Sequence, residues 1–373
     1  MHTYGYGMLW NVLALFGIKA NSNSEQTKCK IIKLSSGLKS PIFFLYVASA
    51  FYSIPMLIHA IIDIHLELRT ILPLLTTCSL SYVLWYVAYK RCQLHRHVAR
   101  KLNDFLLKNH CESFNRSKLL NSIMVTEFLL QLIYVSLLVY CLNLEPEKID
   151  TVWTFGFEME FSFWGNVARF LQGSVYTFQV LTFPGFVSLF MSGMYLHCRD
   201  SLISYGRRLK RFPKPEMHLP YIMEYSIMIE IVREFEDVLS TPAFILVSLN
   251  FLLMFNNVAT FFLLDDTALH LPFLLENGVC LIFSAYSVLS MSLIASETCI
   301  QAQKLSKCFE NLYEEEMARP KPLLRNLSII KAMTDKEIPV MSACSVVYFT
   351  RSFILSVFGG FFTYALLFIN IKN

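Results

Sequence analysis

The chain has 373 residues, of which 55% are hydrophobic and 16% are charged, with a net charge of +4 and a mean hydropathy of +0.47. A soluble domain of this length has too little interior to cover so much apolar surface, so composition excludes an ordinary soluble protein. The apolar residues also form runs of about 18 or more, long enough to cross a hydrocarbon core roughly 30 Å thick.

Seven apolar runs predict seven membrane-spanning helices in an all-α fold, with ends accurate to about four residues. We expect them to form one membrane domain over 1–373, without a soluble module. The start of the chain has no basic residue before its short apolar run, so we expect an uncleaved first span. In chain order the spans are 42–62, 70–89, 119–142, 166–196, 242–264, 273–295 and 352–370.

Basic residues indicate the orientation of these spans. With the N-terminus in the cytosol, the predicted cytosolic segments carry 28 of the 32 Lys and Arg residues, whereas the outer loops are short or acidic. We therefore expect a cytosolic N-terminus and an extracellular C-terminus, the inverse of a G-protein-coupled receptor. The cytosolic segments are 1–41, 90–118, 197–241 and 296–351.

Two cytosolic stretches predict helices that continue membrane spans. Residues 217–239 carry apolar side chains at three- and four-residue spacing. Residues 293–340 predict a second long helix, a turn at Pro320–Pro322, and a further short helix.

The last run places one set of side chains on a single helical stripe: Thr363, Leu366, Leu367 and Asn370. A helix from Ser352 to Asn370 is about 28 Å long, so the amide lies close to the outer surface. An amide costs free energy in lipid unless it faces water or a partner. The stripe therefore has two interpretations. In the first it lines a pore, and the leucines close that pore by excluding water. In the second it packs against neighbouring helices, which the glycines allow to approach closely.

The end of the chain resembles the arthropod gustatory receptors. Gly359-x-x-x-Thr363-Tyr364, five apolar residues and an amide are similar to their closing signature of Thr-Tyr, five hydrophobic residues and Gln-Phe, with Asn370 and Ile371 in place of Gln and Phe. The seven spans, the orientation, the length and the long cytosolic segment before the last helix extend the resemblance to the insect superfamily of odorant and gustatory receptors.

This resemblance implies the insect chemoreceptor channel fold: a ligand-gated, non-selective cation channel of four subunits, each giving its last helix to a central pore. It implies a taste receptor in the plasma membrane of sensory neurons, with an odorant-type subunit as the alternative. The implied partners are a small tastant, the lipid bilayer and related subunits in a homo- or hetero-tetramer, with no nucleic acid and no cofactor. The implied cytosolic anchor between subunits comprises the helical extensions Glu224–Leu239 and Ser296–Glu316 and a short helix before the pore helix, Asp335–Tyr348.

In the resembling family the ligand pocket lies in the outer half of each helical bundle. Each candidate residue here is either pocket lining or a polar contact between helices. Glu127 lies nearer the cytosolic half and is interpreted as a structural or ion-pathway residue. The pocket candidates are Gln172, Tyr176, Gln179, Asn257, Glu276 and Asn277.

The sequence gives little reason to expect an enzyme. Its nine histidines are dispersed, and it has no His-x-x-x-His pair and no phosphate-binding glycine loop, so we expect no metal site and no catalysis. A proton-coupled transporter that uses Glu127, Glu276 and Arg169 is the alternative from another class.

Overall fold

The computed structural model describes residues 11–14, 18, 68–109, 116–144, 162–211, 218–263, 271–318 and 324–372. These residues form helices, short connections and one small hairpin, which confirms the all-α expectation. The elements are α4 (Leu68–Lys108), α5 (Ser117–Leu144), α7 (Phe163–Thr177), the π-helical turn η1 (Phe178–Thr182), α8 (Phe183–Arg211), α9 (His218–Leu263), α10 (Leu271–Met317), α11 (Leu324–Thr334), β1 (Ser342–Ala343), β2 (Val347–Tyr348) and α12 (Arg351–Lys372).

Six of the seven predicted spans fall within these helices, and the first, 42–62, lies outside the described residues. Within the described ranges, four helical stretches are long and apolar enough to cross a membrane, and Arg351–Leu367 is a shorter apolar helix. The count of seven and the orientation stay predictions. The four stretches are Lys118–Leu144, Phe163–Leu209, Met223–Ala259 and Leu274–Met317.

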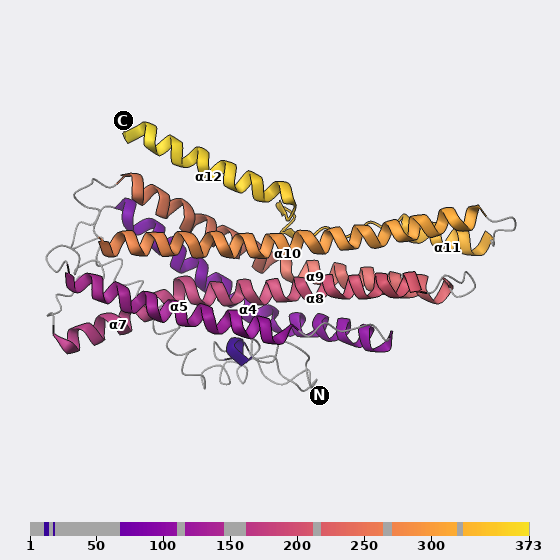
Figure 1. Ribbon diagram of the computed structural model, residues 1–373, viewed down its shortest axis with the longest axis horizontal. Helices are drawn as coiled ribbons and strands as arrows, with labels where there is room; N and C mark the ends of the chain where they lie inside the picture. Colours follow the sequence, from indigo (N-terminus) through magenta and orange to yellow (C-terminus); the bar gives the residue numbers. More distant parts are fainter. Residues whose placement is uncertain are drawn as a thin grey trace.

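The long helices lie side by side along the long axis of the molecule (Figure 1). α9 and α10 have 46 and 47 residues, so each is about 70 Å long, more than twice the thickness of a hydrocarbon core. α11 packs against the far end of α10. The predicted long helices and the short helix are therefore confirmed as helices, and the turn predicted at Pro320–Pro322 lies outside the described residues.

The fourth span is continuous but contains a π-helical turn, which has a sequence cause. Pro184 has no N–H to donate to Val180, so the regular α-helical ladder is interrupted there. The Phe183 N–H instead bonds to the carbonyl of Phe178, five residues back. Ser162 caps the start of this span by accepting a hydrogen bond from the Gly165 N–H at 3.1 Å.

A large hydrophobic cluster holds α4, α8, α9 and α10 together. Tyr225 of α9 and Phe309 of α10 are both buried, with ring centroids 4.1 Å apart. A smaller cluster at the other end of the bundle includes Tyr134, Leu138 and Leu249. The larger cluster extends into the predicted cytosolic part, so the long helices form one packed body beyond the predicted membrane-spanning segments.

The hairpin that precedes α12 corrects one expectation. Asp335–Tyr348, implied as the short helix of the anchor, is not helical: it is extended and then pairs β1 with β2. Pro339 lacks an N–H, and Cys344 and Ser345 form the turn with φ of 52° and 55°, a left-handed conformation that no helix contains. The short helix is α11, directly before this segment.

The extension of α4 that we predict to be cytosolic buries a histidine. His95 is 4% exposed and packs edge-on against Phe190, with ring centroids 5.5 Å apart. Burial lowers the pKa of its imidazole to about 4, with a smaller contribution in the same direction from Arg91, and a hydrogen bond with the backbone of Val238 opposes them. The ring is therefore neutral at pH 7.

This histidine makes stability depend on pH. The unfolded chain takes up a proton near pH 6.5, whereas the folded protein does so only near pH 4, so stability present above pH 6.5 is lost as pH falls toward 4. We expect a loss of about 2 kcal/mol between pH 7 and pH 5. Thermal unfolding of the purified protein should show a pH-dependent loss about 2 kcal/mol smaller in His95→Gln than in wild type or in the control His97→Gln, an exposed neighbour, because the half-buried His197 adds its own loss in all three. If the stability of His95→Gln depended on pH as the stability of wild type does, the contribution assigned to His95 would be contradicted.

Candidate pore helix and intramembrane cavity

α12 packs on the bundle through one face only. It leaves the hairpin near the middle of α10 and runs toward the end of the molecule where α9 ends (Figure 1). The Tyr364 ring meets the edge of Phe255 of α9, with centroids 4.7 Å apart, and Phe353 contacts Phe251 of the same helix at 6.4 Å. The tyrosine of the Thr-Tyr signature therefore points toward the protomer's own bundle.

The opposite face of α12 has no cover among the described residues. Leu366 and Leu367 are 59% and 53% exposed, and a side chain added at Gly359 or Gly360 would meet no atom within 4 Å. The Thr363 hydroxyl donates a hydrogen bond to the Gly359 carbonyl at 2.8 Å, so it is satisfied within the helix. The four residues of the predicted stripe, Thr363, Leu366, Leu367 and Asn370, are all on this exposed face.

The base of α12 is held firmly. Phe349, two residues before the helix, is fully buried and meets Tyr195 of α8 with centroids 6.4 Å apart. Arg351 forms an ion pair with Glu297 of α10 at 2.8 Å. The Met341 N–H donates to the sulfur of Cys299, also on α10, at 3.1 Å.

Hydrogen bonds from α9 hold the hairpin itself. The Ser342 hydroxyl donates to the Glu236 carboxylate at 2.6 Å, and the Cys344 N–H donates to the Ser240 hydroxyl at 2.7 Å. The hairpin is therefore joined to both of the longest helices.

The six residues predicted to bind ligand occupy three neighbouring helices, α7–η1, α9 and α10. Tyr176 and Leu275, the neighbour of Glu276 in the chain, pack against the same smaller hydrophobic cluster. Gln179 is 2% exposed, and its carbonyl accepts a hydrogen bond from the Ser81 hydroxyl at 2.7 Å. Asn257 and Asn277 are also buried, and Gln172 is half-buried.

None of these six lines the cavity that the described helices enclose. This cavity has a volume of about 230 Å³ and lies between α5, α8 and α10. Glu127 is ten residues from the start of α5, about 15 Å, so the cavity lies in the half of the predicted spans nearer the cytosol. Its polar lining includes Glu127, Ser188, Ser192, Asn250, Ser284 and Ser287.

Glu127 reaches across to the backbone of α8. A Cβ atom at Gly185 would lie 1.8 Å from its Oε1, so only glycine allows this approach. One turn further along α5, Gln131 accepts a hydrogen bond from the Thr182 hydroxyl. The α5 carboxylate therefore lies directly against the neighbouring helix.

Serine and asparagine side chains supply the rest of the polar lining. Ser188 donates to the Ser287 carbonyl at 3.3 Å, and Asn250 donates to the Ser287 hydroxyl at 3.3 Å. The hydroxyls of Ser192 and Ser284 are buried without a hydrogen-bond partner in the described ranges. Sequence reasoning missed this set because single serines in apolar helices carry no local pattern.

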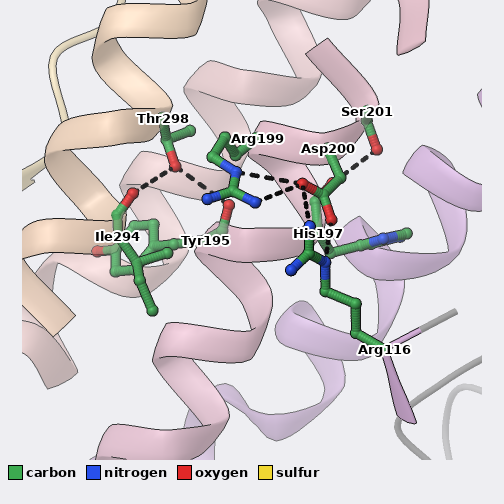
Figure 2. Close-up of polar contacts among 8 residues, drawn as sticks. All are labelled: Arg116, Tyr195, His197, Arg199, Asp200, Ser201, Ile294 and Thr298. Carbon is green, nitrogen blue, oxygen red and sulfur yellow. Dashed lines mark hydrogen bonds and ion pairs between the residues drawn. The ribbon is translucent and has the colours of Figure 1, made fainter. Parts of the chain in front are cut away.

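An ion cluster includes Arg116 of the cavity lining and lies toward the end of the helices that we predict to be cytosolic. Figure 2 shows the residues of this cluster. Asp200, which is 5% exposed, accepts hydrogen bonds from Arg116 at 2.7 Å and from Arg199 at 2.8 Å. Beside it, the Thr298 hydroxyl of α10 bonds to the Tyr195 carbonyl at 3.1 Å. The cluster therefore joins the start of α5 to α8, where α8 also contacts α10.

The sequence matches no protein-family model and no curated protein. The structure is similar to that of the insect olfactory receptor OR5 from Machilis hrabei in complex with eugenol, with a TM-score of 0.61 over 98% of each chain and 10% sequence identity. The chain therefore has the fold of that receptor.

The ion cluster gives a test of this part of the fold. Asp200→Asn keeps the shape but leaves two arginines without their carboxylate, so we expect it to destabilise the protein by about 1–3 kcal/mol. Asp104→Asn, the same change at an exposed position of α4, is the control. Thermal unfolding in detergent compares the two variants with wild type. Equal midpoint temperatures of unfolding for Asp200→Asn and Asp104→Asn would contradict a structural role for the cluster.

Proposed function

We propose that this protein is a subunit of a ligand-gated, non-selective cation channel that acts as a chemosensory receptor in the cell membrane. The exposed stripe of α12 carries this proposal. The similarity of the fold to an insect olfactory receptor supports it independently of the sequence motif. We assign no enzymatic activity.

An isolated protomer would present Thr363 and Asn370 to lipid. An exposed amide in lipid is unfavourable, whereas a shared aqueous pore hydrates it. In a tetramer, homomeric or with related subunits, four copies of α12 form a closed ring around one axis. Leu366 and Leu367 then form the apolar constriction that gates the pore, and Asn370 forms a polar ring beyond it.

The long helical extensions are suited to join the subunits. Glu224–Leu239 of α9 and Ser296–Glu316 of α10 extend beyond the predicted membrane, with α11 and the hairpin packed on them. We assign the cytosolic anchor to these segments.

The activating ligand is a small molecule, and the closing Gly-x-x-x-Thr-Tyr motif favours a tastant and expression in sensory neurons. An odorant-type receptor is the second candidate, since the structure with the similar fold is that of an olfactory receptor in complex with eugenol. Tyr176 and Glu276, near the predicted outer end, remain our candidates for an outer ligand pocket, with Gln172, Gln179, Asn257 and Asn277.

Cysteine accessibility tests the pore assignment. Leu366→Cys should let an externally applied charged thiol reagent block at least half of the cation current, because the side chain faces the conduit. Ala365→Cys, one residue earlier on the half-buried face, is the control and should be unaffected. Recordings use cells that express this chain, in a background without reactive native cysteines.

Asn370→Leu gives a second test of the same assignment. We expect at least a two-fold change in single-channel conductance, since the polar ring becomes apolar. The absence of single-channel openings in wild type would favour a transporter. If the thiol reagent blocked Leu366→Cys and Ala365→Cys equally, the exposed face of α12 would not line the pore.

A further inference from the structure

We propose that the cavity between α5, α8 and α10 is a binding site for a small amphipathic amine whose ammonium group pairs with Glu127. The inference rests on the proposed receptor function and assigns its ligand chemistry to a site nearer the cytosol than the outer candidate pocket.

The cavity contains a carboxylate without a matching cation. Among the described residues no hydrogen bond or ion pair reaches Glu127, although its Oε1 lies against Gly185. Arg116, the cation of the same lining, is eleven residues earlier on the helix, about 16 Å along its axis, and is paired with Asp200. A carboxylate inside an apolar bundle is costly unless it is paired, so a ligand cation is the complementary group.

Two buried hydroxyls supply further acceptors. Ser192 of α8 and Ser284 of α10 are 4% and 1% exposed, line the cavity and have no hydrogen-bond partner in the described part of the chain. Ser192 is seven residues beyond Gly185 on α8, about 10 Å along the helix axis, so these hydroxyls are acceptors for a second polar group of the ligand, and the ammonium donates to Glu127. An anionic ligand would instead place like charge beside Glu127.

The remaining walls require an apolar body on the ligand. Leu120, Ile123 and Leu189 line the cavity with two aromatic rings, Phe283 and Tyr286. These rings favour an aromatic or cationic neighbour. The volume of about 230 Å³ is below the roughly 300–1,000 Å³ of pockets for drug-sized ligands, which fits a single-ring arylalkylamine.

The cavity reaches the lateral surface of the helix bundle, where two of its lining residues are exposed. Leu119 and Tyr286 are 52% and 57% exposed at its edge, within the predicted membrane-spanning part of α5 and α10. A molecule with an apolar ring and one charged end concentrates at the membrane interface, from which this edge is accessible.

Equilibrium binding to the full-length protein in lipid nanodiscs tests the proposal, with 2-phenylethylamine and the uncharged 2-phenylethanol as probes. The two probes have similar size, and the amine is protonated at pH 7 as lysine is. We expect wild type to bind the amine at least ten-fold more tightly than the alcohol. Glu127→Gln should weaken amine binding ten-fold or more and leave alcohol binding unchanged, and the exposed Glu310→Gln of α10 should behave as wild type.

No amine binding, equal affinity for both probes in wild type, or full amine affinity in Glu127→Gln would overturn the proposal. The comparison of probes in wild type needs no variant, so a folding defect in Glu127→Gln does not remove the test. Amine binding without any cation current would reject the channel function and keep the site. A current opened by other compounds, with no amine binding, would reject the site and keep the channel.

Discussion

The burial of Phe349 determines where α12 leaves the bundle. Its ring is fully enclosed and meets Tyr195 of α8 and Phe353 of α12, while its N–H donates to the Met341 carbonyl at 3.1 Å. α12 has aromatic contacts with Phe251 and Phe255 of α9 along one face only, so the fixed point at its base and these contacts together set the direction of the helix. The exposed stripe, and with it the proposed pore, depends on that direction.

α10 connects the cavity to the base of α12. Ser284 and Ser287 line the cavity, and Glu297 and Cys299 contact the residues around the start of α12. These groups lie on one unbroken helix, with Ser287 and Cys299 about 18 Å apart along its axis. A ligand that shifts α10 at the cavity would therefore act on the support of the proposed gate, a small helix shift of the kind that drives many switches.

The polar residues inside the bundle have different roles that sequence does not separate. Gln131 hydrogen-bonds to Thr182 of a neighbouring helix and so stabilises helix packing. Asn250 hydrogen-bonds to Ser287 and also lines the cavity, where Glu127 lies against a glycine of another helix. The sequence does not show which of these side chains contacts another helix and which belongs to a site. The residue that each one contacts is 37 to 58 positions away in the chain.

The sequence by itself determined the helices, their extension beyond the apolar runs and the stripe of Thr363, Leu366, Leu367 and Asn370, because run length and three- to four-residue spacing are local properties. Only the tertiary structure decided that this stripe faces away from its own protomer, that a hairpin replaces the helix implied at Asp335–Tyr348, and that the described cavity lies at Glu127. Those features depend on contacts between distant segments: Ser342 with Glu236, Phe349 with Tyr195, and Glu127 with Gly185. No spacing within one helix encodes them, because they arise only when the helices pack.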